Sequence, residues 1–181
     1  VPHNARFTAD GKLAYVTLQG GTGVAVIDMH KLAKVGEIPV PGIKGPHNLD
    51  LSANGKTLWV RDLVGHVAAV DLASGKELAV IPVGLGHAGI DVIPGGRYVF
   101  TGAIADHVVD VIDPATFKVV KRIEVGQGPH GVRASRDGRW LYVAVTGADK
   151  LAVIDTLTLE VVKQVPLQGK LPFWLAVAGN D

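Results

Sequence analysis

The chain has 181 residues, of which 48% are apolar, so it is long enough to bury a hydrophobic core. Its 18 Lys and Arg nearly balance its 17 Asp and Glu, which leaves no bulk positive field to attract nucleic acid. The sequence contains no cysteine, which excludes disulfides and thiolate metal sites, and no apolar run approaches the roughly 18 residues of a membrane-spanning helix. We therefore expect neither a nucleic-acid partner nor a membrane span.

A repeat of 41 to 44 residues runs through the chain in four copies. In each copy a glycine follows Asp, Asn or Gly, a dipeptide typical of a two-residue hairpin turn with positive φ. Four residues later an aromatic residue lies in a β-branched run, which indicates the second strand of the hairpin. The glycines are Gly11, Gly55, Gly96 and Gly138, and the aromatic residues are Tyr15, Trp59, Phe100 and Tyr142.

A third apolar run in each copy ends at an aspartate, and a short polar turn then leads into a fourth strand. These aspartates are interpreted as strand-end turn formers: Asp28, Asp71, Asp113 and Asp155. The fourth strands are predicted at residues 34–40, 77–83, 118–125 and 160–167. Three of them contain a proline near the end (Pro39, Pro82 and Pro166). Because proline cannot donate to a strand ladder, the fourth strand is predicted to be the outer one.

Such a unit has apolar residues on both faces, so it is stable only when it packs against neighbouring units. The repeats therefore predict an all-β protein, a β-propeller of four-stranded blades, in preference to a linear solenoid with shorter repeats. The blades are predicted at residues 1–44, 45–84, 85–126 and 127–169, and residues 170–181 resemble the first strand of a further blade. Propellers of this kind close with about six to eight blades, so the rest of the same chain or a second copy is expected to complete a larger ring.

Four of the seven histidines occupy nearly the same place in the repeat. They stand eight residues before the turn glycine, or nine in the case of His87, and they are His3, His47, His87 and His130. Phe173 takes this place in the last, partial repeat. The position connects an outer strand to the next innermost strand, so these side chains are predicted to lie near the propeller axis. His66 and His107 are expected on the same face of the disc, and His30 on the opposite one.

A ring of imidazoles near the axis can bind copper, zinc or a haem iron, because neutral imidazole is the commonest protein ligand of such metals. The candidate metal ligands are His3, His47, His87 and His130. The competing interpretation is structural. In WD-repeat propellers a Gly-His pair and a later aspartate form a hydrogen-bonded brace, and His47 with Asp71 could do the same.

Charged residues stand three positions after the histidines that share one register, namely Arg6, Asp50 and Arg133, and Asp91 occupies the matching place in the third repeat. The arginines are candidates for binding carboxylates through their bidentate guanidinium group, and the alternative is ion pairs between blades. Asp50 and Asp91 are the only carboxylates expected near the axis, where a hydrolase would need them. The sequence contains no phosphate loop, serine nucleophile elbow or His-Glu zinc helix.

The segments 10–17 (DGKLAYVT) and 137–144 (DGRWLYVA), each followed by Val-Ile-Asp, resemble the YVTN-type β-propeller repeat family over essentially the whole chain. Residues 125–131 (VGQGPHG) also resemble the Gly-x-x-Pro-His elements of the d-type haem propeller of bacterial cytochrome nitrite reductases. This second resemblance implies that His47 and His130 stand over a haem and that Arg6 or Arg133 binds its carboxylates. It also implies a periplasmic or extracellular location. The chain departs from that family by carrying the histidine in nearly every copy and by lacking a recognisable proximal-ligand segment.

Three functions are compatible with these features. The first is a non-catalytic binding or scaffold module that engages a small molecule or a protein partner on the histidine-rich axial face. The alternative is a haem- or metal-binding, redox-associated propeller with d-type haem or copper as cofactor. The second alternative is a lactonase-like hydrolase. The sequence leaves open whether the chain is an enzyme.

Overall fold

The computed structural model describes residues 1–178, which form four four-stranded antiparallel sheets. Each sheet has its strands in chain order, as predicted. The first contains β1 (Pro2–Phe7), β2 (Leu13–Leu18), β3 (Gly23–Asp28) and β4 (Ala33–Pro39), and the second β5 (Asn48–Leu51), β6 (Thr57–Arg61), β7 (His66–Asp71) and β8 (Glu77–Pro82). The third contains β9 (Ile90–Val92), β10 (Val99–Ala103), β11 (Val108–Asp113) and β12 (Lys118–Glu124), and the fourth β13 (Pro129–Ala134), β14 (Trp140–Val145), β15 (Lys150–Asp155) and β16 (Glu160–Pro166). A single 3-10 turn, η1 (Thr146–Ala148), joins β14 to β15.

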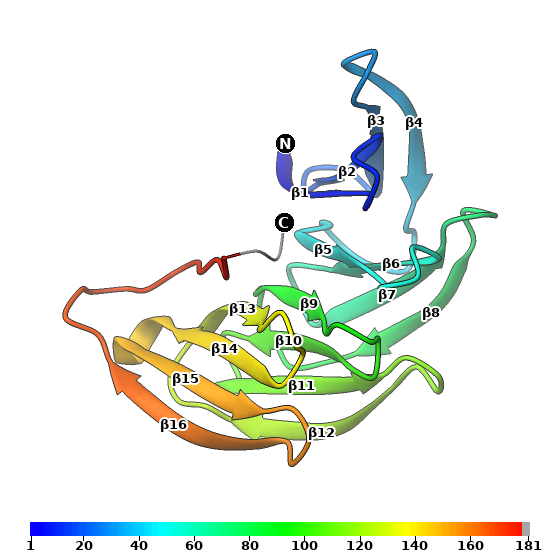
Figure 1. Ribbon diagram of the computed structural model, residues 1–181. Coiled ribbons are helices and arrows are strands. Elements are labelled where there is room, and N and C mark those ends of the chain that lie inside the picture. Colours follow the sequence, from blue (N-terminus) through cyan, green and yellow to red (C-terminus); the bar gives the residue numbers. More distant parts are fainter. Residues whose placement is uncertain (179–181) are drawn as a thin grey trace.

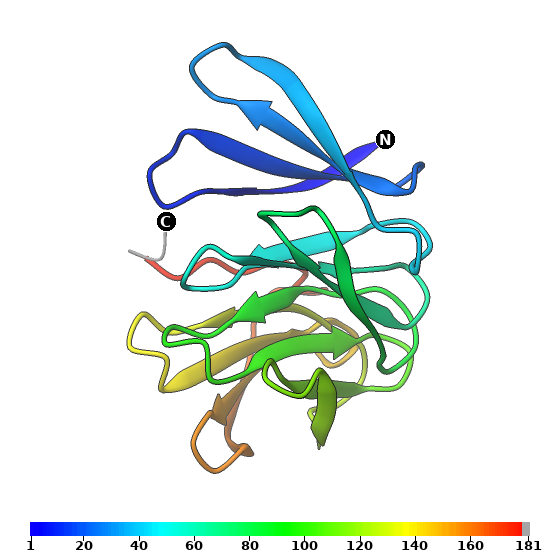
Figure 2. The ribbon, with the colours of Figure 1, turned by 90° about the vertical axis from the view of Figure 1, so that its right-hand side faces the viewer.

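The four sheets are blades arranged around an axis. The first strands of the blades, β1, β5, β9 and β13, lie side by side near the centre, and the fourth strands lie at the periphery (Figure 1). Figure 2, a side view, shows the blades following one another in chain order from the first at the top to the fourth at the bottom. The all-β propeller architecture predicted from the repeat is confirmed. Within residues 1–178 no helix has the length and apolar character needed to cross a bilayer.

The core lies between the blades, and the recurring aromatic residues of the second strands help to build it. Tyr15 joins the core between the first and second blades, Trp59 the one between the second and third, and Phe100 the one between the third and fourth. Trp59 is 1% exposed and Phe100 is fully buried. Truncating a buried side chain of this size to alanine costs about 3–5 kcal/mol, so contacts between blades stabilise the fold strongly.

The hairpin turns between first and second strands are longer than predicted. The prediction of two-residue turns is wrong, because residues 8–12 separate β1 from β2. The hydroxyl of Thr8 accepts a hydrogen bond from the Leu13 backbone N–H, and Gly11 N–H donates to the Thr8 carbonyl. These bonds close a wider turn, in which Gly11 nevertheless has the expected positive φ of 67°.

The outer strands share a β-bulge at the same place. One residue of each outer strand is inserted between two residues paired with the third strand, and the four are Val35, Leu78, Val120 and Val162. Each is about half exposed. A bulge twists an edge strand and breaks its regular ladder, which protects it against pairing with another sheet.

The chain returns to the centre after β16 (Figure 1). Residues 170–178 are not assigned to a strand, but the segment passes beside β13: a Cβ atom at Gly131 would lie 2.8 Å from the Phe173 carbonyl oxygen. Thr146 also donates a hydrogen bond to the Pro172 carbonyl, at 2.6 Å. That residues 170–181 form the first strand of a further blade stays a prediction, and residues 179–181 lie outside the described residues.

Candidate functional site on the axial face

Three of the four axial histidines, His47, His87 and His130, follow a glycine in the connection that enters their blade. Gly45 and Gly128 stand two residues before His47 and His130, and Gly86 stands one residue before His87. All three glycines have positive φ, between 67° and 87°, a conformation that turns the chain inward and that glycine adopts without strain. Because Gly86 stands one residue before its histidine instead of two, His87 is offset by one position in the repeat.

The rings form a continuous row, one from each blade. The centroids of His3 and His47 lie 3.9 Å apart, those of His47 and His87 4.8 Å, and those of His87 and His130 5.2 Å. Phe173 continues the row by stacking on His130 at 3.7 Å. The structure thus brings the four predicted histidines together.

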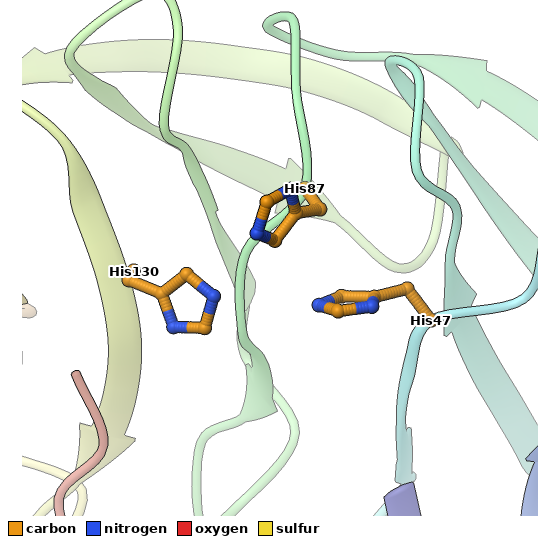
Figure 3. A group of neighbouring side chains, drawn as sticks. All are labelled: His47, His87 and His130. Atoms are coloured by element: carbon orange, nitrogen blue, oxygen red, sulfur yellow. The ribbon is translucent and has the colours of Figure 1, made fainter. Parts of the chain in front are cut away.

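Three of these histidines also bring ligand nitrogens together. One ring nitrogen from each of His47, His87 and His130 lies within 4.8 Å of the others, and Figure 3 shows the rings converging from neighbouring blades. We call this group the three-histidine cluster. His3 is outside this group, and its Nδ1 is engaged with the His47 carbonyl oxygen at 2.8 Å.

The cluster contains two buried nitrogens that have no hydrogen-bond partner. His47 is 3% exposed and His130 is fully buried, and the Nε2 atom of each is unsatisfied. The opposite nitrogens are engaged: His47 Nδ1 lies 3.1 Å from the side-chain nitrogen of Gln19, and His130 Nδ1 lies 3.2 Å from the Phe173 carbonyl oxygen. Since buried polar atoms are rarely left unpaired, two such atoms in one cluster suggest that a ligand satisfies them.

The environment keeps these imidazoles neutral. Burial, together with the neighbouring histidines, lowers the pKa of His47 to about 3. Burial and His87 lower the pKa of His130 to about 4, and burial also lowers the pKa of His87. Neutral imidazole has a free lone pair, which is the form that binds a metal or a haem iron.

The charged residues on the first strands connect blades to one another. Arg6 Nε donates to Asp50 at 3.1 Å, and Asp50 also accepts the Val92 backbone N–H from the next blade. Arg133 pairs with Asp91 at 2.7 Å. The two arginines predicted to bind haem carboxylates are therefore already paired, although Nη2 of Arg6 is buried without a partner.

The two aspartates suggested for a hydrolase are held by these pairs. Burial, together with the charge of Asp50, raises the pKa of Asp91 to about 6. Asp50 pairs with Arg6 and accepts a hydrogen bond from the Val92 backbone N–H. Asp91 pairs with Arg133 and accepts a hydrogen bond from the Ala134 backbone N–H. Both carboxylates therefore join neighbouring blades.

The remaining histidines lie outside the cluster. His66 bonds Asp62, and His107 accepts the Gly128 backbone N–H in the connection leading to His130. His30 borders the hairpin turn that contains Asp10, at the other end of the first blade. Asp71 bonds Ser74 within its own turn rather than His47, so the brace suggested by WD-repeat propellers does not form.

Sequence reasoning did not anticipate the residues that hold the histidines in place. Thr17 donates to the His47 carbonyl across the junction of the first and second blades. Thr101 donates to the Gly89 carbonyl within the third blade, and Thr146 donates to the Pro172 carbonyl of the segment after β16. These threonines stand six, five and eight residues after their turn glycines, so the repeat gives no common signal for them.

The fold and the axial site together define a class, a β-propeller whose central face is lined by neutral histidines. Residues 57–171 match the model of the cytochrome D1 heme domain, and the chain belongs to that family. The predicted resemblance to the d-type haem propeller is thereby confirmed. No curated protein gives a significant match.

Solved structures with a similar fold include two enzymes. Hydrazine synthase from Kuenenia stuttgartiensis has 26% identity and a TM-score of 0.82, with 91% of this chain and 48% of that one covered. NirN, a dihydro-heme d1 dehydrogenase in complex with DHE, has 23% identity and a TM-score of 0.71, with 92% and 38% covered. A functionally unknown protein from Desulfotomaculum acetoxidans DSM 771 has 16% identity and a TM-score of 0.86, with 98% and 59% covered. The chain therefore spans between 38% and 59% of the length of these structures.

Proposed function

We propose that this chain is a haem-binding propeller module of a redox-associated periplasmic protein and that its axial histidines face the cofactor. The observation that carries the proposal is that the cytochrome D1 heme domain match covers His87 and His130, two members of the three-histidine cluster. This support favours the haem-binding alternative over the non-catalytic scaffold that sequence reasoning placed first. The periplasmic location is supported by the family resemblance alone.

The residues present fit a haem in part. His130 Nδ1 donates to the Phe173 carbonyl oxygen, so its Nε2 atom has the free lone pair that a ligand of iron requires. His47 offers the same lone pair when the Gln19 amide presents its oxygen to Nδ1. The unpaired Nη2 of Arg6 is suited to a haem carboxylate. A bound haem would supply one-electron chemistry at its iron, while the protein supplies binding, orientation and electrostatics.

The test is a titration of the chain with haem d1 and, separately, haem b, followed by visible absorption. We expect a saturable Soret shift at one equivalent that His130→Gln or His47→Gln weakens. His30→Gln is the matched control, because His30 lies away from the axial face. Absence of saturable uptake, or uptake unchanged in both axial variants, would contradict the proposal.

A non-catalytic binding module is the second candidate, and the row of ring contacts between neighbouring blades favours it. His3 and His130 both make contacts that join one blade to the next, as structural braces would. In that case the axial variants lower the melting temperature and the wild-type chain takes up no haem. The same titration combined with thermal melts therefore separates the two functions.

A further inference from the structure

We infer that His47, His87 and His130 bind a single divalent transition-metal ion directly, through three imidazole nitrogens and with an open fourth position. The site would take a bare ion of the zinc, copper or cobalt type. The inference goes beyond the proposed haem function and does not depend on it, because the ion needs no macrocycle.

The geometry of the cluster suits an ion. Imidazole nitrogens lie about 2.0–2.1 Å from zinc, so three tetrahedral ligands lie roughly 3.4 Å from one another. The three nitrogens already lie within 4.8 Å of one another in the absence of an ion. Shifts of about one ångström by the rings would complete the site. His87 has the freedom to make such a shift, since it is only partly buried.

The two unsatisfied nitrogens are the second, independent observation. Leaving a buried polar atom without a partner costs about 1–3 kcal/mol, and the Nε2 atoms of His47 and His130 both carry this cost. Both rings are more than nine-tenths buried, and both belong to the group whose nitrogens converge. An ion bound between the rings would satisfy both atoms at once.

The contacts behind the rings orient them as metal ligands are usually oriented. With the proton on Nδ1, His130 donates to the Phe173 carbonyl oxygen and leaves the Nε2 lone pair facing the cluster. The side-chain amide nitrogen of Gln19 lies 3.1 Å from His47 Nδ1. With the amide turned over, its carbonyl oxygen accepts a hydrogen bond from Nδ1–H and leaves the Nε2 lone pair free. Such outer contacts fix the tautomer of a ligand histidine.

The donor set selects the class of metal and argues against one haem iron as the ligand of all three rings. Three imidazoles, with no carboxylate in the group, favour zinc, copper or cobalt over magnesium or calcium. The macrocycle fills four positions of a haem iron and leaves two, on opposite sides. Three nitrogens from three adjacent blades exceed that number, whereas a three-histidine ion site uses all of them.

The experiment is a titration of chelator-treated, tag-free chain with Co²⁺, read by visible absorption, and with Zn²⁺, read by calorimetry. We expect one equivalent of either ion and the intense Co²⁺ bands of four-coordinate geometry. His87→Gln is the first variant, because a partly buried residue can be replaced with the least risk to folding. It should weaken binding by at least about 100-fold, since loss of outer contacts alone costs 10–100-fold.

Matched controls define the ligand set. His30→Gln and His66→Gln remove histidines outside the cluster, and His3→Gln removes the neighbour that is in the row but outside the ligand group. All three should retain wild-type affinity. The inference is overturned by the absence of stoichiometric binding, or by binding that His87→Gln and His130→Gln leave unchanged.

The outcome is separable from that of the haem titration. An ion site requires His47, His87 and His130 together, whereas haem uptake requires one axial ligand, or two on opposite sides. Co²⁺ binding without haem uptake supports the ion site and contradicts the haem proposal. Haem uptake without Co²⁺ binding supports the haem proposal and contradicts the ion site.

Discussion

His130 and Phe173 lie face to face, with ring centroids 3.7 Å apart and an angle of 22° between the ring planes. The Phe173 carbonyl oxygen lies 3.2 Å from His130 Nδ1, so the same residue both stacks on the imidazole and accepts a hydrogen bond from it. Phe173 belongs to the segment after the last strand, 43 residues beyond His130. The position of this segment therefore controls both the orientation and the tautomer of a cluster histidine.

Replacing Phe173 should loosen this end of the row. Phe173→Ala removes an aromatic pair worth about 0.5–1.5 kcal/mol and some buried area, and we expect a total loss of about 1–2 kcal/mol. At 2–4 °C for each kcal/mol, the melting temperature should fall by about 2–8 °C. Phe7→Ala is the control, since Phe7 is 55% exposed and outside the row. Equal effects of the two variants in thermal melts would show that the stack contributes nothing specific.

Asp50 should be more important for stability than a surface carboxylate. Asp50→Ala leaves the Arg6 guanidinium and the Val92 backbone N–H without their acceptor, and we expect a loss of about 2–4 kcal/mol in urea unfolding. Glu37→Ala removes an exposed pair with Lys34 and should have no measurable effect, because surface ion pairs contribute little. If Asp50→Ala is as stable as Glu37→Ala, Asp50 does not stabilise the contacts between the blades.

The hydroxyl of Thr17 should be required at the first blade junction. This fully buried hydroxyl accepts the Asn4 backbone N–H and donates to the His47 carbonyl. Thr17→Val keeps the shape but leaves the Asn4 backbone N–H without its acceptor and removes one of the two hydrogen-bond partners of the His47 carbonyl. This should lower the free energy of unfolding by about 1–3 kcal/mol. Thr17→Ser retains the hydroxyl and should recover most of this loss. A valine variant as stable as the serine variant would contradict the assignment.

The metal-free chain should lose stability in mild acid. The folded pKa values of His47 and His130 are about 3 and about 4, below the ordinary value of 6.5, so the unfolded chain takes up more protons between about pH 6.5 and pH 4. Stability is therefore fully present above pH 6.5 and falls as the pH is lowered through this range.

His130→Gln provides the test of this pH dependence. Glutamine does not titrate, so the variant should show a shallower fall when urea unfolding is followed from pH 7.5 to 4.5 in the presence of a chelator. Asp91 acts in the opposite direction, because its raised pKa adds stability at low pH. Asp91 is present in both the wild-type chain and the variant. The difference between their pH profiles therefore reports the contribution of His130 alone. Parallel pH profiles would refute the prediction.

Much of the fold could be predicted because its signals are local. Apolar runs ending at aspartates such as Asp28 predicted the third strands, and prolines such as Pro39 predicted the outer ones. The length of the hairpin turns could not be predicted from the Asp-Gly pair. At Thr8 a side-chain hydroxyl competes for backbone hydrogen bonds and widens the turn, an effect that the dipeptide does not encode.

The repeat pattern was enough to predict the blades, their strand order and the gathering of histidines at one point of the repeat. These follow from the period of the repeat and from backbone preferences of glycine, proline and β-branched residues. The packing of the blades brings His47, His87 and His130 together, whereas the ring of His3 contacts a carbonyl group. The same packing pairs Asp50 with Arg6. Distances between blades depend on how their sheets pack against one another, and residue spacing within a blade does not contain that information.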